Sequence, residues 1–235
     1  MSENIKKTTK AFRVDLDSSK NQIMLKPIAR YSFNNQTHQV SEATEKIHKL
    51  IKNASYSNDD IVLKRNEIKE AFFSPFKPQL KNAQVFLSHL HADKNKALEV
   101  KDYLENQTKR KVFIDSLFWD YKDGVLNELA KHDDISRIKD AFTLILRESL
   151  QDMIEKCPYF VFLQSKNSVS NQGLSRITYS AWIYEELKIA HSISAISESR
   201  PIPMMESMQV FHDISPFLEN LKTITLSELS RIINS

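Results

Sequence analysis

Glycine and cysteine are almost absent from this chain. Only Gly124 and Gly173 occur among 235 residues, which excludes the glycine-rich phosphate loops of dinucleotide-binding and P-loop proteins. The single Cys157 cannot form an internal disulfide. No apolar run approaches the ~20 residues of a membrane span, and the first residues lack the apolar centre of a secretory signal. We therefore expect a cytoplasmic protein with no membrane partner.

The composition is that of a chain able to bury a core. Hydrophobic residues make up 41% and charged residues 27% of the sequence. The formal net charge is only +3, and no basic stripe is interleaved with aromatic residues. Nucleic acid is therefore not an expected partner.

The first 80 residues are predicted to form a mainly helical N-terminal extension. Their first 40 residues are polar, with two short strand-like pieces that could be a tail or a hairpin, Phe12–Leu16 and Ile23–Leu25. Two helices are expected after them, at Ser41–Asn53 and Asn58–Phe73. Pro75 and Pro78 then mark a boundary, which predicts a second domain over residues 81–235.

Beyond residue 80 the pattern predicts an α/β fold with a parallel sheet flanked by helices. Short continuous apolar runs are typical of strands covered on both faces; they lie at Val85–Leu87, Val112–Ile114 and Tyr159–Leu163. Helices are expected between and after them, at 93–106, 143–156 and 175–196. A fourth strand is expected at Ile202–Met205 or Gln209–His212, and a closing helix at Ser227–Ile233.

Polar side chains follow each predicted strand. Ser88 and His89 follow the first strand, Ser116 and Trp119 lie just beyond the second, and Gln164 ends the third. In open parallel sheets, ligands bind at the carboxyl ends of the strands. We therefore expect a binding site along this edge.

Glu186 lies in the apolar face of the helix predicted at 175–196. At roughly 100° per residue, the apolar residues share one arc, namely Tyr179, Trp182, Ile183, Leu187, Ile189, Ala190, Ile193 and Ile196. Glu186 falls near its middle, and Glu185 lies at its margin. A carboxylate in such a place is either desolvated at a cost or faces a polar cavity. We interpret Glu186 as facing a pocket; a slightly rotated helix would instead leave it exposed or salt-bridged.

A metal site is not expected. His89 and His91 lie close to Asp93, but two histidines without a third ligand at a recognisable spacing are too few. Cys157 is interpreted as a small buried residue, because no basic partner lies beside it in the sequence.

Four motifs together resemble a Toll/interleukin receptor (TIR) domain of the bacterial type. They are Val85–His89 with Asp93–Lys94, Val112–Asp115, Phe160–Ser168 and Ser180–Leu187. The resemblance covers about residues 83–235 and implies a flavodoxin-like fold. TIR enzymes of this type split NAD+ at its nicotinamide bond, and many act in antiphage defence. Some release ADP-ribose, and others make cyclic or conjugated ADP-ribose signals.

The resemblance also implies roles for residues. The catalytic glutamate of that family follows a tryptophan by four positions, as Glu186 follows Trp182. Ser88 and its neighbour His89 would line the pocket floor, and Ser116 and Trp119 would belong to a loop that covers the nucleotide. NAD+ would be the substrate, no metal would take part, and the chain would self-associate and signal to a downstream effector. The charged insert 116–142 departs from the receptor pattern and leaves the usual mode of assembly open.

Two other functions fit the same pattern. Many TIR domains are non-catalytic adaptors that dock with other TIR domains. A nucleoside deoxyribosyltransferase-like enzyme would share the flavodoxin-like layout and a glutamate at the sugar. Glu186 pointing into bulk solvent would favour the adaptor.

Overall fold

The chain is organised as two compact units, each built from separate stretches of sequence. A computed structural model describes residues 9–26, 34–53, 55–57, 60–62, 64–75, 82–131, 136–172, 175–194 and 211–235, with backbone alone at 34–39, 55–57, 60–62, 117–119, 136–141, 172 and 194. Unit 1 comprises residues 1–28, 83–115 and 151–235, and unit 2 comprises residues 29–82 and 116–150.

The centre of unit 1 is a parallel sheet of five strands in the order β10-β1-β6-β4-β5. All four neighbouring pairs are parallel. The strands span Lys10–Asp15 (β1), Ala83–Ser88 (β4), Lys111–Ile114 (β5), Tyr159–Gln164 (β6) and Lys222–Thr223 (β10). The structure thus confirms the predicted α/β class and a sheet consistent with a flavodoxin-like fold.

Apolar residues on both faces explain the three strands that the sequence predicts. β4 and β6 are buried along almost their whole length, as continuous apolar runs require. Phe86 of β4 stacks on Phe160 of β6 with ring centroids 5.9 Å apart, and Phe113 of β5 lies 5.7 Å from Phe86 on the other side. This aromatic row joins the middle of the sheet.

β1 is the strand that the sequence interpretation placed outside the domain. Residues 10–15 pair with 159–164 of β6 over six consecutive positions. Phe12 and Val14 are buried, whereas Arg13 between them is half-buried, so the strand alternates. The second strand-like piece is not a strand, because Ile23 and Met24 form a turn after the short helix α1 (Ser19–Gln22). Ile23 is 84% exposed.

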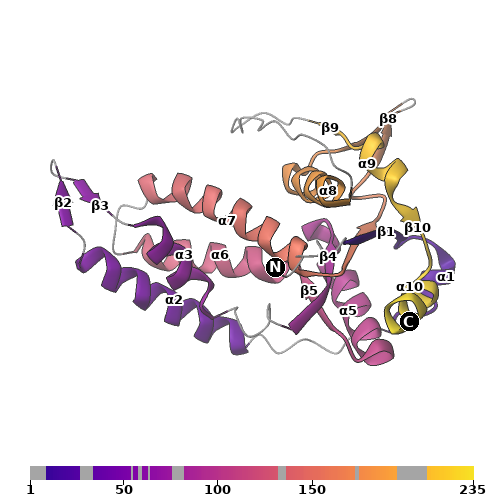
Figure 1. The fold of residues 1–235 in the computed structure, drawn as a ribbon, viewed down its shortest axis with the longest axis horizontal. Helices are drawn as coiled ribbons and strands as arrows, with labels where there is room; N and C mark the ends of the chain where they lie inside the picture. The colour runs from indigo at the N-terminus through magenta and orange to yellow at the C-terminus, as the bar shows by residue number, and fades with distance from the viewer. Residues whose placement is uncertain are drawn as a thin grey trace, which may run out of the picture. The chain divides into compact units, whose positions relative to one another are not determined.

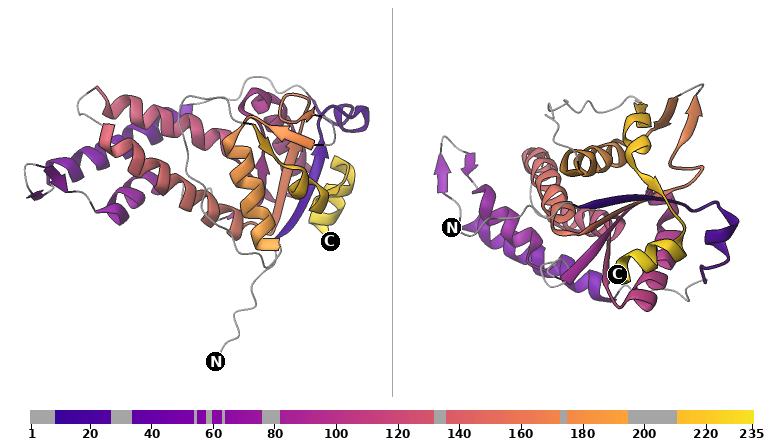
Figure 2. Two further views of the ribbon diagram at one scale, coloured as in Figure 1. Left: turned by 90° about the horizontal axis from the view of Figure 1, so that it is seen from above. Right: turned by 45° about the vertical axis from the view of Figure 1, so that its right-hand side comes forward.

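Helices cover both faces of this sheet (Figures 1 and 2). α8 (Ala181–Ser194) and α9 (Ser215–Asn220) lie on one side, and α5 (Lys94–Thr108) and α10 (Leu226–Asn234) lie on the other. A short turn of 3-10 helix, His91–Asp93, precedes α5. α10 confirms the predicted closing helix and begins with a capping box of Thr225 and Glu228.

A small antiparallel sheet precedes and follows α8. It contains β7 (Ser170–Gln172), β8 (Ser175–Thr178) and β9 (His212–Asp213). The helix predicted at 175–196 therefore begins six residues late, because the β-branched Ile177 and Thr178 are buried in a strand. Tyr179 lies before the helix and is 55% exposed, so it does not belong to the apolar arc.

Of the predicted fourth strand at 209–212, the structure describes only Phe211 and His212, and neither belongs to the parallel sheet. His212 belongs to the antiparallel β9, and the alternative Ile202–Met205 lies outside the described residues. The place beside β6 is filled by β1 from the N-terminal part of the chain. Sequence order therefore did not reveal the neighbour of β6.

Unit 2 is mainly helical. It combines residues 29–82 with residues 116–150, two stretches that the sequence did not predict to pack together. Its helices are α2 (Asn34–Lys52), α3 (Arg65–Phe73), α6 (Asp115–Leu129) and the first fifteen residues of α7 (Ser136–Lys156). Phe72 of α3 contacts both Tyr121 of α6 and Phe142 of α7, with ring centroids 5.0 and 5.1 Å apart. The Tyr121 hydroxyl donates to the Phe72 carbonyl oxygen at 2.6 Å.

One prediction in this part is wrong, and the predicted division of the chain differs from the two compact units. Residues 58–73 do not form one helix: a hairpin of β2 (Ser55–Ser57) and β3 (Asp60–Val62) precedes α3, as strand-forming Ile61 and Val62 favour. The division into 1–80 and 81–235 also differs from the structure, in which residues 1–28 belong to the sheet unit and 116–150 to the helical unit. The cause is the long-range pairing of β1 with β6.

Candidate functional site

The carboxyl ends of β4 and β5 place two polar side chains next to each other. Leu87 pairs with Ile114, so the next residues along the two strands, Ser88 and Asp115, are neighbours at the sheet edge. Ser88 also pairs with Phe162 of β6. The next two strands after β4 in the sequence, β5 and β6, lie on opposite sides of it. The strand order therefore reverses at β4. Such a switch point is where ligands bind in open α/β sheets.

Helix α8 brings Glu186 to this edge. The helix begins after Ser180, whose hydroxyl accepts a hydrogen bond from the Ile183 amide at 3.3 Å. Ile183, Leu187 and Ala190 are each 1% exposed and form the buried stripe. Glu186 lies within that stripe and is 0% exposed, as its position on the helical wheel predicts.

The surroundings of Glu186 disfavour its charged form. Complete burial and the nearby carboxyl group of Asp115 raise the pKa of Glu186 well above 4.5, and the Ser88 hydroxyl acts in the opposite direction. Both groups are thus close to Glu186. Neither carboxylate oxygen nor the Ser88 hydroxyl, however, has a hydrogen-bond partner of good geometry within the described part of the chain. The protein therefore buries a carboxyl group whose hydrogen-bonding capacity is unused.

His89 is held against Asp115. Its Nδ1 atom lies 2.7 Å from Oδ1 of Asp115, within ion-pair distance, although the ring is not aligned for a hydrogen bond. The side chains are 0% and 5% exposed. Burial alone would lower the pKa of His89, but Asp115, the Leu87 carbonyl and Asp93 together outweigh it, so the pKa is raised above 6.5. The resemblance implied a substrate-binding role for His89; in the structure it pairs with a second carboxylate.

The remaining predicted site residues lie in helices. Trp182 is half-buried one turn before Glu186 on α8. Ser116 is buried in the first turn of α6, and Trp119 lies in the same helix with its side chain outside the described part. The predicted loop after the second strand is therefore wrong, because α6 begins directly at Asp115. A buried stripe holds that helix, formed by Tyr121, Val125 and Leu129.

Asp115 and Asp93 are the acidic residues whose roles the sequence interpretation did not identify. Asp93 is buried and accepts hydrogen bonds from the Ser165 hydroxyl and from Nδ2 of Asn167, the latter at 2.9 Å. It thereby ties the start of α5 to the turn after β6. Asp115 could have been suspected as the polar residue that ends an apolar run, but its contact with Glu186 depends on strand pairing that the sequence does not show.

Other chemistries find little support among the described side chains. Cys157 is buried, and burial raises the pKa of its thiol to about 12, so it is not a thiolate at neutral pH. Among the residues that the structure describes, no group of three or more His, Cys, Asp or Glu side chains could hold a metal ion. Within the same residues, every helix is too short or too polar to cross a bilayer.

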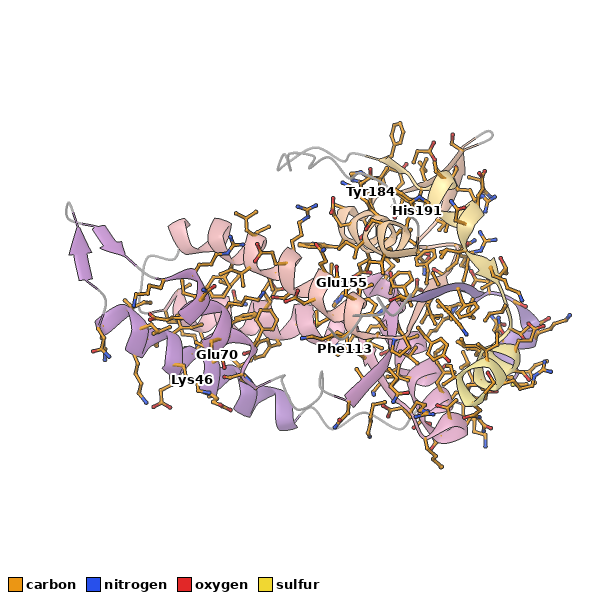
Figure 3. The ribbon with its side chains drawn as sticks, in the orientation of Figure 1. Lys46, Glu70, Phe113, Glu155, Tyr184 and His191 are labelled. Carbon is orange, nitrogen blue, oxygen red and sulfur yellow. The ribbon has the colours of Figure 1, made fainter. Side chains whose placement is uncertain are left out.

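Aromatic contacts hold α8 against α9 and β9. Tyr184 stacks on His212 with centroids 4.8 Å apart, and Phe217 of α9 lies 5.5 Å from Tyr184 and 5.6 Å from His191. Figure 3 labels Tyr184 and His191 on this helix. These contacts fix the rotation of α8 about its axis, and with it the inward direction of Glu186.

Comparison with family models, with curated proteins and with solved structures found no match. The resemblance to TIR domains therefore stays a prediction that rests on the four motifs.

Proposed function

We propose that this chain cleaves the nicotinamide–ribose bond of NAD+, with Glu186 as the catalytic residue. The observation that carries the proposal is the fully buried Glu186 carboxyl group at the switch point of the sheet, beside Ser88 and Asp115. Burying such a group without hydrogen bonds costs stability, so a functional reason is needed. The products would be nicotinamide and either ADP-ribose or a cyclic or conjugated form of it.

The main requirement of the reaction is a carboxylate held beside the ribose. When the C–N bond breaks, its electron pair leaves with the nicotinamide nitrogen and neutralises the cationic ring, so no acid is required. Positive charge develops on the ribose, where Glu186 would stabilise it. Water or a hydroxyl group then attacks the anomeric carbon and loses its proton. Trp182, one turn away, would pack against the ribose or the nicotinamide ring.

The charge of NAD+ matches the electrostatics of this site. Burial and the Asp115 carboxyl group favour the protonated form of Glu186, because both raise its pKa. A cationic nicotinamide ring placed beside Glu186 would lower that pKa again and restore the carboxylate. Substrate binding would thus release a proton and create the charged catalyst. Because Glu186 is 0% exposed, the site must open to admit the substrate.

The test is a product assay with the purified full chain, repeated at high protein concentration because the resemblance implies self-association. We expect nicotinamide release that falls by at least about 100-fold in Glu186→Gln. Glu185→Gln is the matched control, since Glu185 lies next in sequence and faces Lys188 at 3.9 Å. Turnover by Glu186→Gln at the wild-type rate would refute the assignment of the catalytic residue.

A second candidate is a nucleoside deoxyribosyltransferase-like reaction, and Asp115 favours it. A neutral nucleobase must be protonated to leave, and two adjacent carboxyl groups that hold one proton provide both an acid and a carboxylate. Incubation with a deoxynucleoside and a second free base, followed by product analysis, separates the two reactions. Base exchange without nicotinamide release from NAD+ would favour the second candidate.

The biological role follows from the resemblance and belongs to the proposal. We expect a part in antiphage defence, with self-association through the TIR-like unit and a downstream effector that senses the product. A non-catalytic adaptor is the alternative, but docking has no use for a carboxyl group that is buried and that accepts no hydrogen bond from the described residues. An adaptor would keep its partner binding in Glu186→Gln and would release no nicotinamide in any variant.

A further inference from the structure

Gln164 at the end of β6 has a side-chain oxygen that nothing in the described part of the chain satisfies. Oε1 of Gln164 is buried and accepts no hydrogen bond from the described residues. The residue as a whole is half-buried, so its amide group lies at the margin of the protein interior. A buried acceptor without a donor costs free energy, which makes this oxygen a candidate for contact with a ligand.

The hydrogen bond of Tyr159 shows on which face of the sheet Gln164 lies. The Tyr159 hydroxyl donates to the Ile232 carbonyl oxygen of α10 at 3.3 Å, so Tyr159 points to the side of α5 and α10. Side chains alternate along a strand, which turns Phe162 and Gln164 to the opposite side. α8 covers that side (Figures 1 and 2), and it packs on β1, the neighbour of β6.

The strand register places Gln164 near Ser88. Ser88 of β4 pairs with Phe162, and Gln164 follows Phe162 by two residues towards the carboxyl end of the sheet. From the spacing of strands and of residues along them, the Cα atoms of Ser88 and Gln164 are roughly 8 Å apart. Glu186 lies in the buried stripe of α8 on this side, and the Ser88 hydroxyl is close enough to act on its carboxyl group. Gln164 and Glu186 therefore belong to one site.

This site is rich in hydrogen-bond acceptors. Besides Gln164, buried oxygens without a hydrogen-bond partner in the described part of the chain belong to Ser88, Asp115 and Glu186. An amide oxygen and an ionised carboxyl group only accept hydrogen bonds. A ligand that fits must therefore bring N–H or O–H donors, whereas a carboxylate on the ligand would face acceptors and like charge.

We propose that Gln164 recognises the carboxamide group of the nicotinamide ring, and that it thereby makes the site select the amide over the corresponding acid. This inference rests on the proposed function. A primary amide carries an acceptor and two donors in one plane, so Gln164 can accept from the carboxamide nitrogen through Oε1 and donate to the carboxamide oxygen through Nε2. The width of one aromatic ring separates the carboxamide from the anomeric carbon. That separation suits a Gln164 placed one residue pair beyond Ser88.

An acid analogue of the substrate tests the proposal. Nicotinic acid adenine dinucleotide differs from NAD+ only in the group that Gln164 would contact. We expect the full-length wild-type chain to prefer NAD+ by at least about 100-fold in kcat/KM. In Gln164→Leu, KM for NAD+ should rise by about tenfold with kcat little changed, and the preference should fall by about the same factor. Gln107→Leu, at an exposed glutamine of α5, is the matched control and should change neither quantity.

A second variant separates recognition from a disturbed fold. Gln164→Glu keeps an oxygen that accepts from the carboxamide, but its charge repels a carboxylate. Gln164→Glu should therefore keep the preference for NAD+ at or above the wild-type value. An equal loss on both dinucleotides in Gln164→Leu would mean that Gln164 contacts a group that they share, such as a ribose hydroxyl, and would overturn the proposal.

Binding separates this proposal from the catalytic one. Ligand-observed NMR with free nicotinamide and free nicotinic acid needs no turnover, so it tests Gln164 even if NAD+ is not cleaved. We expect the wild-type chain to bind nicotinamide more tightly than nicotinic acid, and Gln164→Leu but not Gln107→Leu to lose this difference. Selective binding without cleavage of NAD+ would overturn only the catalytic proposal. Equal binding of the two rings, or cleavage of both dinucleotides at equal rates, would overturn the role of Gln164 and leave the assignment of Glu186 intact.

Discussion

At the residue scale, the stability cost of Glu186 is measurable. The raised pKa of Glu186 means that the folded state holds a proton that the unfolded chain releases above about pH 4.5. Stability from this group is therefore complete below pH 4.5 and falls as pH rises towards the raised pKa. Glutamine carries no charge and can donate to Asp115, so Glu186→Gln should raise the free energy of unfolding at pH 8 by about 1–3 kcal/mol. Urea unfolding at pH 5 and pH 8 measures the change.

The pH series provides the control. The advantage of Glu186→Gln should shrink towards pH 5, where the wild-type carboxyl group is protonated in the folded state. Glu185→Gln serves as the control, because Glu185 is next in the sequence and its carboxylate lies 3.9 Å from Nζ of Lys188 instead of beside Asp115. If Glu186→Gln were less stable than the wild type at pH 8, the Glu186 carboxylate would have to be stabilised by an interaction other than its contacts with Ser88 and Asp115.

His89 gives the same pH dependence by a different route. Its raised pKa means that the pairing with Asp115 contributes fully below pH 6.5 and is lost as pH rises through the folded-state value. We expect His89→Gln to lower the free energy of unfolding by about 1–3 kcal/mol at pH 6, with a smaller loss at pH 9. The exposed His91→Gln serves as the control. A loss independent of pH would mean that His89 contributes by packing alone.

At the scale of elements, Gly124 is placed for close helix packing. A glycine inside a helix costs about 1 kcal/mol relative to alanine, yet Gly124 lies in the middle of α6. A Cβ atom at this position would lie 3.0 Å from Cγ2 of Val40 on α2. The glycine therefore lets α2 and α6 approach each other.

A double-mutant cycle tests this packing. Gly124→Ala alone should change the free energy of unfolding little, because the gain in helix propensity is offset by the clash with Val40. In a Val40→Ala background the same change should stabilise by about 1 kcal/mol, since the clash is gone. Chemical unfolding of the four proteins gives the coupling. Equal effects in both backgrounds would contradict the contact.

The sequence allowed the continuous strands β4, β5 and β6 to be predicted, and α8 with its inward Glu186, because each of these patterns is local. The strand-like piece at Phe12–Leu16 was recognised, but its place in the sheet as β1 was not, because β1 alternates, with Arg13 and Asp15 half-buried between apolar residues, and because its partner lies about 150 residues away. The role of Asp115 escaped prediction for the same reason. Its neighbours are determined by strand register, and local periodicity contains no information about register.

At the scale of the whole molecule, the position of β1 means that the sheet unit is not contained in residues 81–235. A chain that begins at residue 81 would leave the edges of β6 and β10 unpaired in the middle of the sheet. We expect it to lack cooperative thermal unfolding and to be degraded quickly by protease. A chain that begins at Thr9 keeps β1 whole and should unfold like the full-length protein. Cooperative unfolding of the shorter chain would show that β1 is dispensable.

The pairing of β1 with β6 also has a consequence for synthesis on the ribosome. The first strand leaves the exit tunnel about 150 residues before its partner, which at 5–20 residues per second means a delay of roughly 7–30 s. Because α8 follows β6 in the sequence, β1, β4, β5 and β6 have all been made by the time Glu186 leaves the ribosome. The order of synthesis therefore supplies the central strands of the sheet before the helix that carries Glu186, so Glu186 can be buried as soon as α8 forms.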